Sequence, residues 1–301
     1  MTKPSFATTT AKRLKEYYAF SDTVVATVAD FANTQAEYDS YQAFFSSVGV
    51  STSTTLYLNE QGNAAPVIDL SPKGASKGTI VVHLPMANPL DPNQLYQVAT
   101  IVGTNPDYRV IGFGNPSGKP YRFKEQNLTL LNRLRIATRR TLRPLVEAEL
   151  SYLESQRITD AIHVGFSYGA AKALIESGLQ AKDGVRGLVV IELVSHPRGL
   201  KQLASDFKST LAPLGEYADR PGLETYLEAR RSSIAGKEVQ RGLMRPINLA
   251  IGFILARLDL LKMLKDYSAK NPTVPITIAW GSKSELVDDT LMQAACLLYT
   301  S

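Results

Sequence analysis

Short runs of apolar, often β-branched residues recur along the chain, and turn-forming residues separate them. Runs of this length with few polar interruptions predict strands that are buried on both faces of a sheet. Between the first two runs, Gly62 and Asn63 indicate a turn and therefore an antiparallel pair. The predicted strands are residues 54–58, 66–70, 79–84, 108–113, 161–164, 185–194 and 275–280.

Segments with apolar residues at helical spacing lie between these strands. Residues 93–102 predict one helix, and residues 127–156 predict a longer one that Pro144 should kink or divide. Strands that alternate with helices predict a doubly wound, mostly parallel α/β sheet with right-handed crossovers. Residues 197–273 are helical in pattern and too long for a single crossover, so they predict an inserted helical cap or lid. The predicted parts are an N-terminal helical extension (1–50), the core (51–196 and 274–301) and the cap.

Composition narrows the functional classes. The chain is 44% apolar and 20% charged, and its net charge of +5 is spread along the sequence, so nucleic acid is not an indicated partner. The single cysteine, Cys296, excludes an intramolecular disulfide. No signal-peptide core is visible, and no apolar run reaches the roughly 20 residues that span a bilayer, which predicts a cytoplasmic protein. No His, Cys and carboxylate cluster has metal-ligand spacing, so neither a metal nor an organic cofactor is predicted.

One motif carries candidate chemistry. The apolar run that begins at Ala161 ends in Gly165-Phe-Ser-Tyr-Gly169 and passes directly into an alanine-rich helical segment. This pattern predicts a strand, a sharp turn with Ser167 at its apex, and a helix. The turn strains its central residue, and side chains at Gly165 or Gly169 would collide with the neighbouring strand and helix.

This strand–turn–helix stretch resembles the nucleophile elbow of the α/β-hydrolases, and the resemblance extends from about Leu56 to Val287. In that family the elbow serine attacks an acyl carbonyl, a role that maps to Ser167. The backbone N–H of Tyr168 would then donate to the oxyanion. A position at a helix N-terminus favours negative charge that develops beside Ser167.

A second oxyanion donor should come from the loop after residues 79–84, where the family often has His-Gly. If His83 occupies the position of the family histidine, the donor would be Pro85, which has no N–H. An alignment shifted by two residues makes Met86 or Ala87 the donor, and we prefer this second alignment.

The family usually places the catalytic acid just after the last predicted strand. Ser284 occupies the aspartate position of the family pattern, and Glu285, one residue further, is our candidate acid. Asp288 and Asp289 are weaker candidates that suit the start of a helix. Glu192, near the end of another predicted strand, is a further alternative.

The chain has three histidines, and none follows Glu285, where the family base would lie. His163 lies within the elbow strand and should pack in the core, and His83 could line the pocket. His196 follows a predicted strand at its carboxyl end, where sites of open α/β sheets gather. We interpret the sequence as a fragment that lacks its general base, and we expect it to show little or no ester turnover.

The resemblance implies a serine hydrolase that cleaves a small-molecule carboxylic ester or thioester through an acyl-enzyme, with no cofactor. The alternative is a non-catalytic protein of the same fold that binds a small ligand or a protein partner. The serine at position 284 and the unusual oxyanion loop favour this alternative.

Overall fold

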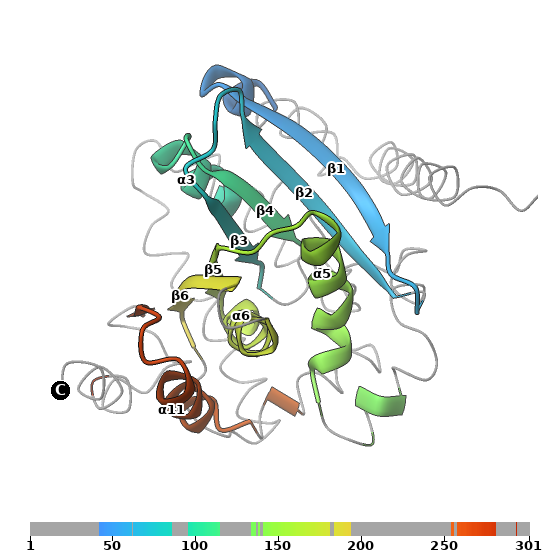
Figure 1. Cartoon of the computed structure of the whole chain (residues 1–301), viewed down its shortest axis with the longest axis vertical. Helices are drawn as coiled ribbons and strands as arrows, with labels where there is room; N and C mark the ends of the chain where they lie inside the picture. The colour runs from blue at the N-terminus through green and yellow to red at the C-terminus, as the bar shows by residue number, and fades with distance from the viewer. Residues whose placement is uncertain are drawn as a thin grey trace, which may run out of the picture.

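A single sheet organises the part of the chain that the computed structural model describes, which is residues 42–61, 63–85, 96–114, 134–136, 138, 141–180, 184–193, 254–255, 258–280 and 293. The sheet has seven strands in the order β1-β2-β4-β3-β5-β6-β7 (Figure 1). They are β1 (Val50–Leu58), β2 (Ala64–Pro72), β3 (Thr79–His83), β4 (Arg109–Phe113), β5 (Ala161–Phe166), β6 (Val185–Ile191) and β7 (Ile276–Ala279).

Strand directions confirm the predicted sheet. β1 and β2 form an antiparallel pair, and β2 also pairs antiparallel with β4. From β4 to β7 every pairing is parallel. In the turn between β1 and β2, the Asn63 N–H donates to the side-chain oxygen of Asn59 at 2.8 Å. The antiparallel hairpin predicted from this turn is therefore confirmed, as is the mostly parallel remainder.

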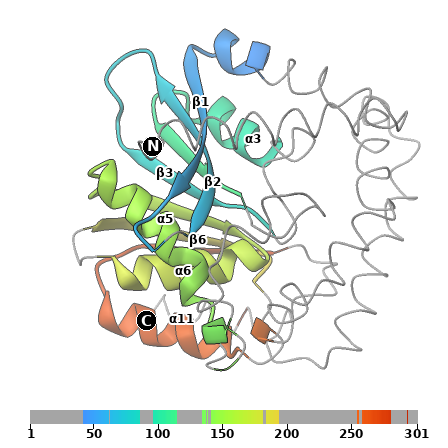
Figure 2. The same ribbon diagram turned by 90° about the vertical axis from the view of Figure 1, so that its right-hand side faces the viewer.

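Helices cover both faces of the sheet. Figure 2 shows α3 (Tyr96–Thr104) on one face, and α5 (Arg143–Ser155), α6 (Tyr168–Leu179) and α11 (Leu260–Lys270) on the other. Consecutive residues of β3 point to opposite faces, as strand geometry requires. Val82 packs in the core beneath α3, and Val81 packs with residues of α5. The predicted doubly wound architecture is therefore confirmed.

The long helix predicted before β5 is divided near Pro144. Residues 134–136 are helical, whereas Thr141 and Leu142 are not, and α5 begins only at Arg143. Pro144 lies in the first turn of α5, where a missing N–H removes no intrahelical hydrogen bond. The proline therefore sets where α5 can begin.

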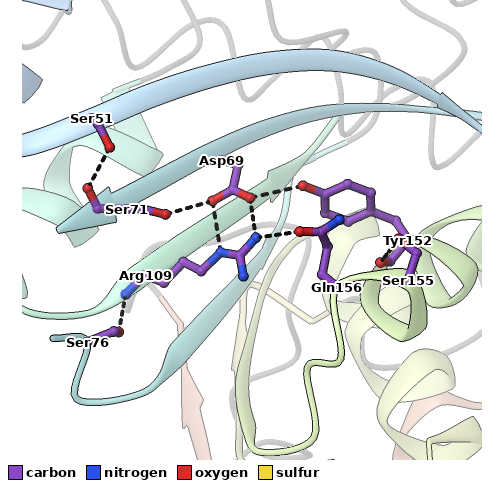
Figure 3. Close-up of polar contacts among 8 residues, drawn as sticks. All are labelled: Ser51, Asp69, Ser71, Ser76, Arg109, Tyr152, Ser155 and Gln156. Carbon is purple, nitrogen blue, oxygen red and sulfur yellow. Dashed lines mark hydrogen bonds and ion pairs between the residues drawn. The ribbon is translucent and has the colours of Figure 1, made fainter. Parts of the chain in front are cut away.

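A half-buried ionic network joins β2, β4 and α5. Asp69 of β2 accepts hydrogen bonds from the Arg109 guanidinium, with Nε at 3.0 Å, and from the Tyr152 hydroxyl at 2.9 Å (Figure 3). The same guanidinium donates to the Gln156 amide oxygen at 3.0 Å, just beyond the end of α5. Burial and the nearby Asp69 charge raise the pKa of Tyr152, so its hydroxyl remains a donor.

α11 connects the region after β6 to β7 and packs against α6. Asp259 caps its N-terminus by accepting from the Lys262 N–H at 2.8 Å. Leu264 and Tyr267 join the core that α6 and β6 form. α11 belongs to the segment 197–273 predicted as a cap, and most of that segment lies outside the described residues. Within the described part of the chain, every helix is too short or too polar to cross a membrane.

Candidate active site at the β5–α6 turn

Ser167 lies at the sharp turn between β5 and α6. Its backbone has φ 53° and ψ −117°, a positive φ that residues other than glycine rarely adopt. The Ser167 N–H donates to the Ile191 carbonyl at 2.8 Å, and the Ser167 carbonyl accepts from Ala170 at 2.9 Å. These bonds hold the turn in a strained conformation, with the half-buried serine at the carboxyl end of the parallel strands.

Both flanking glycines are required by close backbone approaches. A Cβ atom on Gly165 would lie 2.3 Å from the Gly169 carbonyl oxygen. A Cβ atom on Gly169 would lie 2.0 Å from the His83 carbonyl oxygen and 2.9 Å from that of Leu84. The reason predicted for these glycines is confirmed, and the end of β3 is found against the start of α6.

Two features of this arrangement suit an anion beside Ser167. Tyr168 is the first residue of α6, where backbone N–H groups have no intrahelical acceptor and the helix dipole is positive. The loop after β3 begins next to the same turn, because His83 and Leu84 contact Gly169. The predicted donors Met86 and Ala87 follow in that loop and lie outside the described residues.

Of the candidate acids, only Glu192 is described. It directly follows β6, has φ 54°, and donates its N–H to the Ala279 carbonyl at 2.9 Å. Because the Ile191 carbonyl accepts from the Ser167 N–H, Glu192 lies at the same carboxyl end of the strands as the serine. Glu285, Asp288 and Asp289 lie outside the described residues, so their assignment stays a prediction.

The structure places two histidines in a buried polar cluster. His83 and His163 have no exposed surface, and their Nε2 and Nδ1 atoms lie 3.2 Å apart. The core position predicted for His163 is confirmed, and His83 is buried with it. His196, the third histidine, lies outside the described residues.

Residues of α5 and α6 complete this cluster. The Glu149 carboxylate accepts from the Lys172 ammonium and lies 3.3 Å from His83 Nδ1. The Gln180 amide oxygen lies 2.8 Å from His163 Nε2, and a Glu176 carboxyl oxygen is within 3.8 Å of both rings. Both rings are therefore engaged within the cluster.

Burial sets the protonation of these groups. It lowers the pKa of His83, and it lowers the pKa of His163 to about 3, with the His83 charge adding to the effect. Burial and then the Glu149 charge raise the pKa of Glu176 well above its usual value. Burial also acts to raise the pKa of Glu149, but Lys172 and His83 outweigh it and the pKa is lowered. Glu149 and Lys172 thus form a buried ion pair.

Sequence reasoning missed the acidic and basic members of this cluster. Tyr168, Lys172 and Glu176 are four residues apart and share one face of α6, and Gln180 follows directly after the helix. Lys and Glu at this spacing resemble an exposed ion pair on a helix surface. The available signal was that this polar stripe crosses a helix which is alanine-rich elsewhere and follows a buried strand.

Comparisons with protein-family models and with curated proteins find no match to this sequence. Solved structures match over most of the chain at low identity. An esterase from Exiguobacterium antarcticum is 14% identical, with 80% of this chain and 85% of that chain covered and a TM-score of 0.52. An esterase from a Rhodococcus species is 12% identical, with 82% of this chain and 86% of the esterase covered and a TM-score of 0.51. N-formylmaleamic acid deformylase from Pseudomonas putida is 11% identical, with 83% of this chain and 89% of the deformylase covered and a TM-score of 0.50.

These likenesses agree with the strand directions and with the helices on both faces of the sheet. The chain therefore has the α/β-hydrolase fold, as the sequence predicted.

Proposed function

We propose that this protein is a hydrolase that cleaves a carboxylic ester or thioester through an acyl-enzyme on Ser167. The observation that carries the proposal is the conformation of Ser167, a strained positive φ at the N-terminus of α6. A fold gains no stability from such strain, which is typical of sites where function requires it. The esterases among the similar structures support the same bond class.

The proposed reaction has two stages. The Ser167 hydroxyl oxygen attacks the acyl carbonyl carbon while a base takes the hydroxyl proton, and that proton passes to the departing alcohol or thiol. The Tyr168 N–H, with the N–H of Met86 or Ala87, stabilises the oxyanion. Water then attacks the acyl-enzyme by the same path, releases the acid and restores the serine. A lid formed by part of residues 197–273 would exclude bulk water.

Glu285 is the proposed acid, and its role is to orient the histidine that acts as base. The contacts of His83 and His163 argue against either as that base, because their ring nitrogens face partners within a closed interior. In the family that the chain resembles, the base follows the acid in the sequence. His196 precedes Glu285, so His196→Ala is expected to leave kcat unchanged, and a large loss of kcat would assign the base to His196.

The test is hydrolysis of p-nitrophenyl acyl esters by the full-length protein. We expect Ser167→Ala to lower kcat/KM by roughly 10³-fold or more, because the covalent step is lost. Ser51→Ala is the matched control, since Ser51 is exposed on β1 at the far edge of the sheet and should leave kcat/KM unchanged. Equal activity of Ser167→Ala and wild type would exclude the proposed nucleophile.

A second candidate is a non-catalytic protein of this fold that binds a small ligand or a partner. Two observations favour it: both described histidines are buried in the cluster, and position 284 is a serine. In that case folded wild type would hydrolyse no ester, and Ser167→Ala would bind the same ligand as wild type.

A further inference from the structure

The buried cluster beside α6 contains three groups that suit a metal ion and that the proposed reaction does not use. His83 ends β3, His163 lies in β5 and Glu176 lies in α6, and each has no exposed surface. One ligand atom from each lies within 4.8 Å of the others. The three residues are far apart in the sequence, so their spacing gave no sign of a site.

The nearest oxygen acceptors indicate where each imidazole carries its proton. His163 Nε2 lies 2.8 Å from the Gln180 amide oxygen, which can only accept, so Nε2 must donate. His83 Nδ1 lies 3.3 Å from a Glu149 carboxylate oxygen, which favours the proton on that nitrogen although the hydrogen-bond geometry is poor. In the neutral rings the other two nitrogens, His83 Nε2 and His163 Nδ1, then carry lone pairs.

In these tautomers neither nitrogen carries a proton to share across the 3.2 Å that separates them, whereas the other tautomer of either ring would make the contact a hydrogen bond. A cation between the nitrogens would remove the repulsion between the two lone pairs. The outer contacts are those that metal-binding histidines usually make, in which the distal N–H donates to a carboxylate or another oxygen acceptor. Glu149 and Gln180 therefore match the partners of a pair of histidine ligands.

Glu176 places a carboxyl group at the same point, and a metal ion would bind its ionised form. Neither of its carboxyl oxygens makes a well-formed hydrogen bond among the described residues, a costly arrangement for a buried group, although Glu149 lies close enough to interact with it. Its Oε1 lies 3.6 Å from His83 Nε2 and 3.8 Å from His163 Nδ1, too far for hydrogen bonds. Ligand atoms around a tetrahedral zinc ion are about 3.3–3.5 Å apart, close to the observed separations.

We propose that His83 Nε2, His163 Nδ1 and the Glu176 carboxylate bind a divalent transition metal, most suitably Zn²⁺. Imidazole and carboxylate ligands suit zinc, and the second oxygen of Glu176 or a water completes the coordination. Glu149 keeps its pairing with Lys172, so Glu176 is the carboxylate that balances the metal charge. The ion would hold the end of β3, β5 and α6 together beneath the elbow, as a structural site.

Metal content of the purified full-length protein tests this site. Because the site is closed, the protein is expressed with zinc, washed with chelator while folded, then denatured and analysed by mass spectrometry for metals. We expect about one zinc per chain, retained through the wash. Glu176→Gln, which keeps the side-chain shape, should lower the zinc content at least about tenfold. Glu154→Gln, an exposed carboxylate of α5, and His196→Ala are the controls and should retain the metal.

A second measurement decides the question if Glu176→Gln does not fold. Wild-type protein is denatured with chelator and refolded with zinc, with cobalt or with chelator alone. Compared with chelator alone, zinc should raise the yield of refolded protein and its Tm. Cobalt should give the visible absorption of a tetrahedral site. Folded wild type with less than about one-tenth of a metal ion per chain, and refolding that zinc does not change, would overturn the proposal. Ser167→Ala should keep the metal, so loss of ester hydrolysis and loss of the site are separate outcomes.

Discussion

Ser167 is the residue at which fold and proposed function conflict. A serine with φ 53° is strained by about 1–3 kcal/mol, and the strain remains when the side chain is shortened to alanine. Glycine has no Cβ and adopts positive φ without that strain. We therefore expect Ser167→Gly to unfold at higher urea than Ser167→Ala, with a free energy of unfolding about 1 kcal/mol larger. If the glycine variant is the less stable of the two, Ser167 is not under strain.

Gly169 is the residue on which the approach of β3 to α6 depends. In Gly169→Ala the new methyl group would lie 2.0 Å from the His83 carbonyl oxygen, so strand or helix must move. We expect the free energy of unfolding to fall by at least about 3 kcal/mol in urea titration. Gly74→Ala is the control, because a Cβ atom on Gly74 would have no neighbouring atom within 4 Å, and its stability should change by less than about 0.5 kcal/mol. Similar stability of the two variants would contradict the close approach.

Two carboxylates compete for the role of acid. We expect Glu285→Gln to lower kcat for ester hydrolysis by roughly 10³–10⁴-fold, because the histidine loses the group that orients it. Glu192 lies at the same carboxyl end of the strands as Ser167, and Glu192→Gln should lower kcat by less than about tenfold if the acid lies elsewhere. The reverse order of effects would move the acid from Glu285 to the end of β6.

At the scale of elements, Asp69 joins two strands to a helix. Its carboxylate accepts from Arg109 of β4 and Tyr152 of α5. Asp69→Ala would leave the buried Tyr152 hydroxyl without this acceptor and would leave Arg109 its contact with Gln156. We expect a loss of about 2 kcal/mol in the free energy of unfolding. Tyr152→Phe removes only one of these bonds and should lose about 1 kcal/mol. Equal losses in the two variants would show that the Arg109 contact contributes little.

Elements were predictable where one physical cause dominates. The buried strands are contiguous apolar runs, so β3 to β7 could be located within a few residues. Pro144 fixed the start of α5, since proline fits only the first helical turn. The burial of the polar face of α6 was missed, because Lys172 and Glu176 at helical spacing look the same on an exposed surface as in an interior that pairs them.

At the scale of the whole molecule, the parallel sheet brings together groups that the sequence separates. The carboxyl ends of the parallel strands β3, β5 and β6 lie at the same end of the sheet. Leu84, Ser167 and Glu192 therefore all lie at that end. The elbow could be predicted because strand, turn and helix are contiguous in the chain. The buried cluster could not, because His83, Glu149, His163 and Glu176 come from four elements and meet only through the register of β3 with β5 and the packing of α5 on α6.

The claim that Ser167 is an activated nucleophile is tested most directly by a fluorophosphonate probe, with the labelled peptide identified by mass spectrometry. Applied to the folded full-length protein, the probe should form one adduct per chain, on Ser167. The adduct should be absent in Ser167→Ala and unchanged in Ser51→Ala. Folded wild type that remains unlabelled, or that carries the adduct on another serine, would contradict the account.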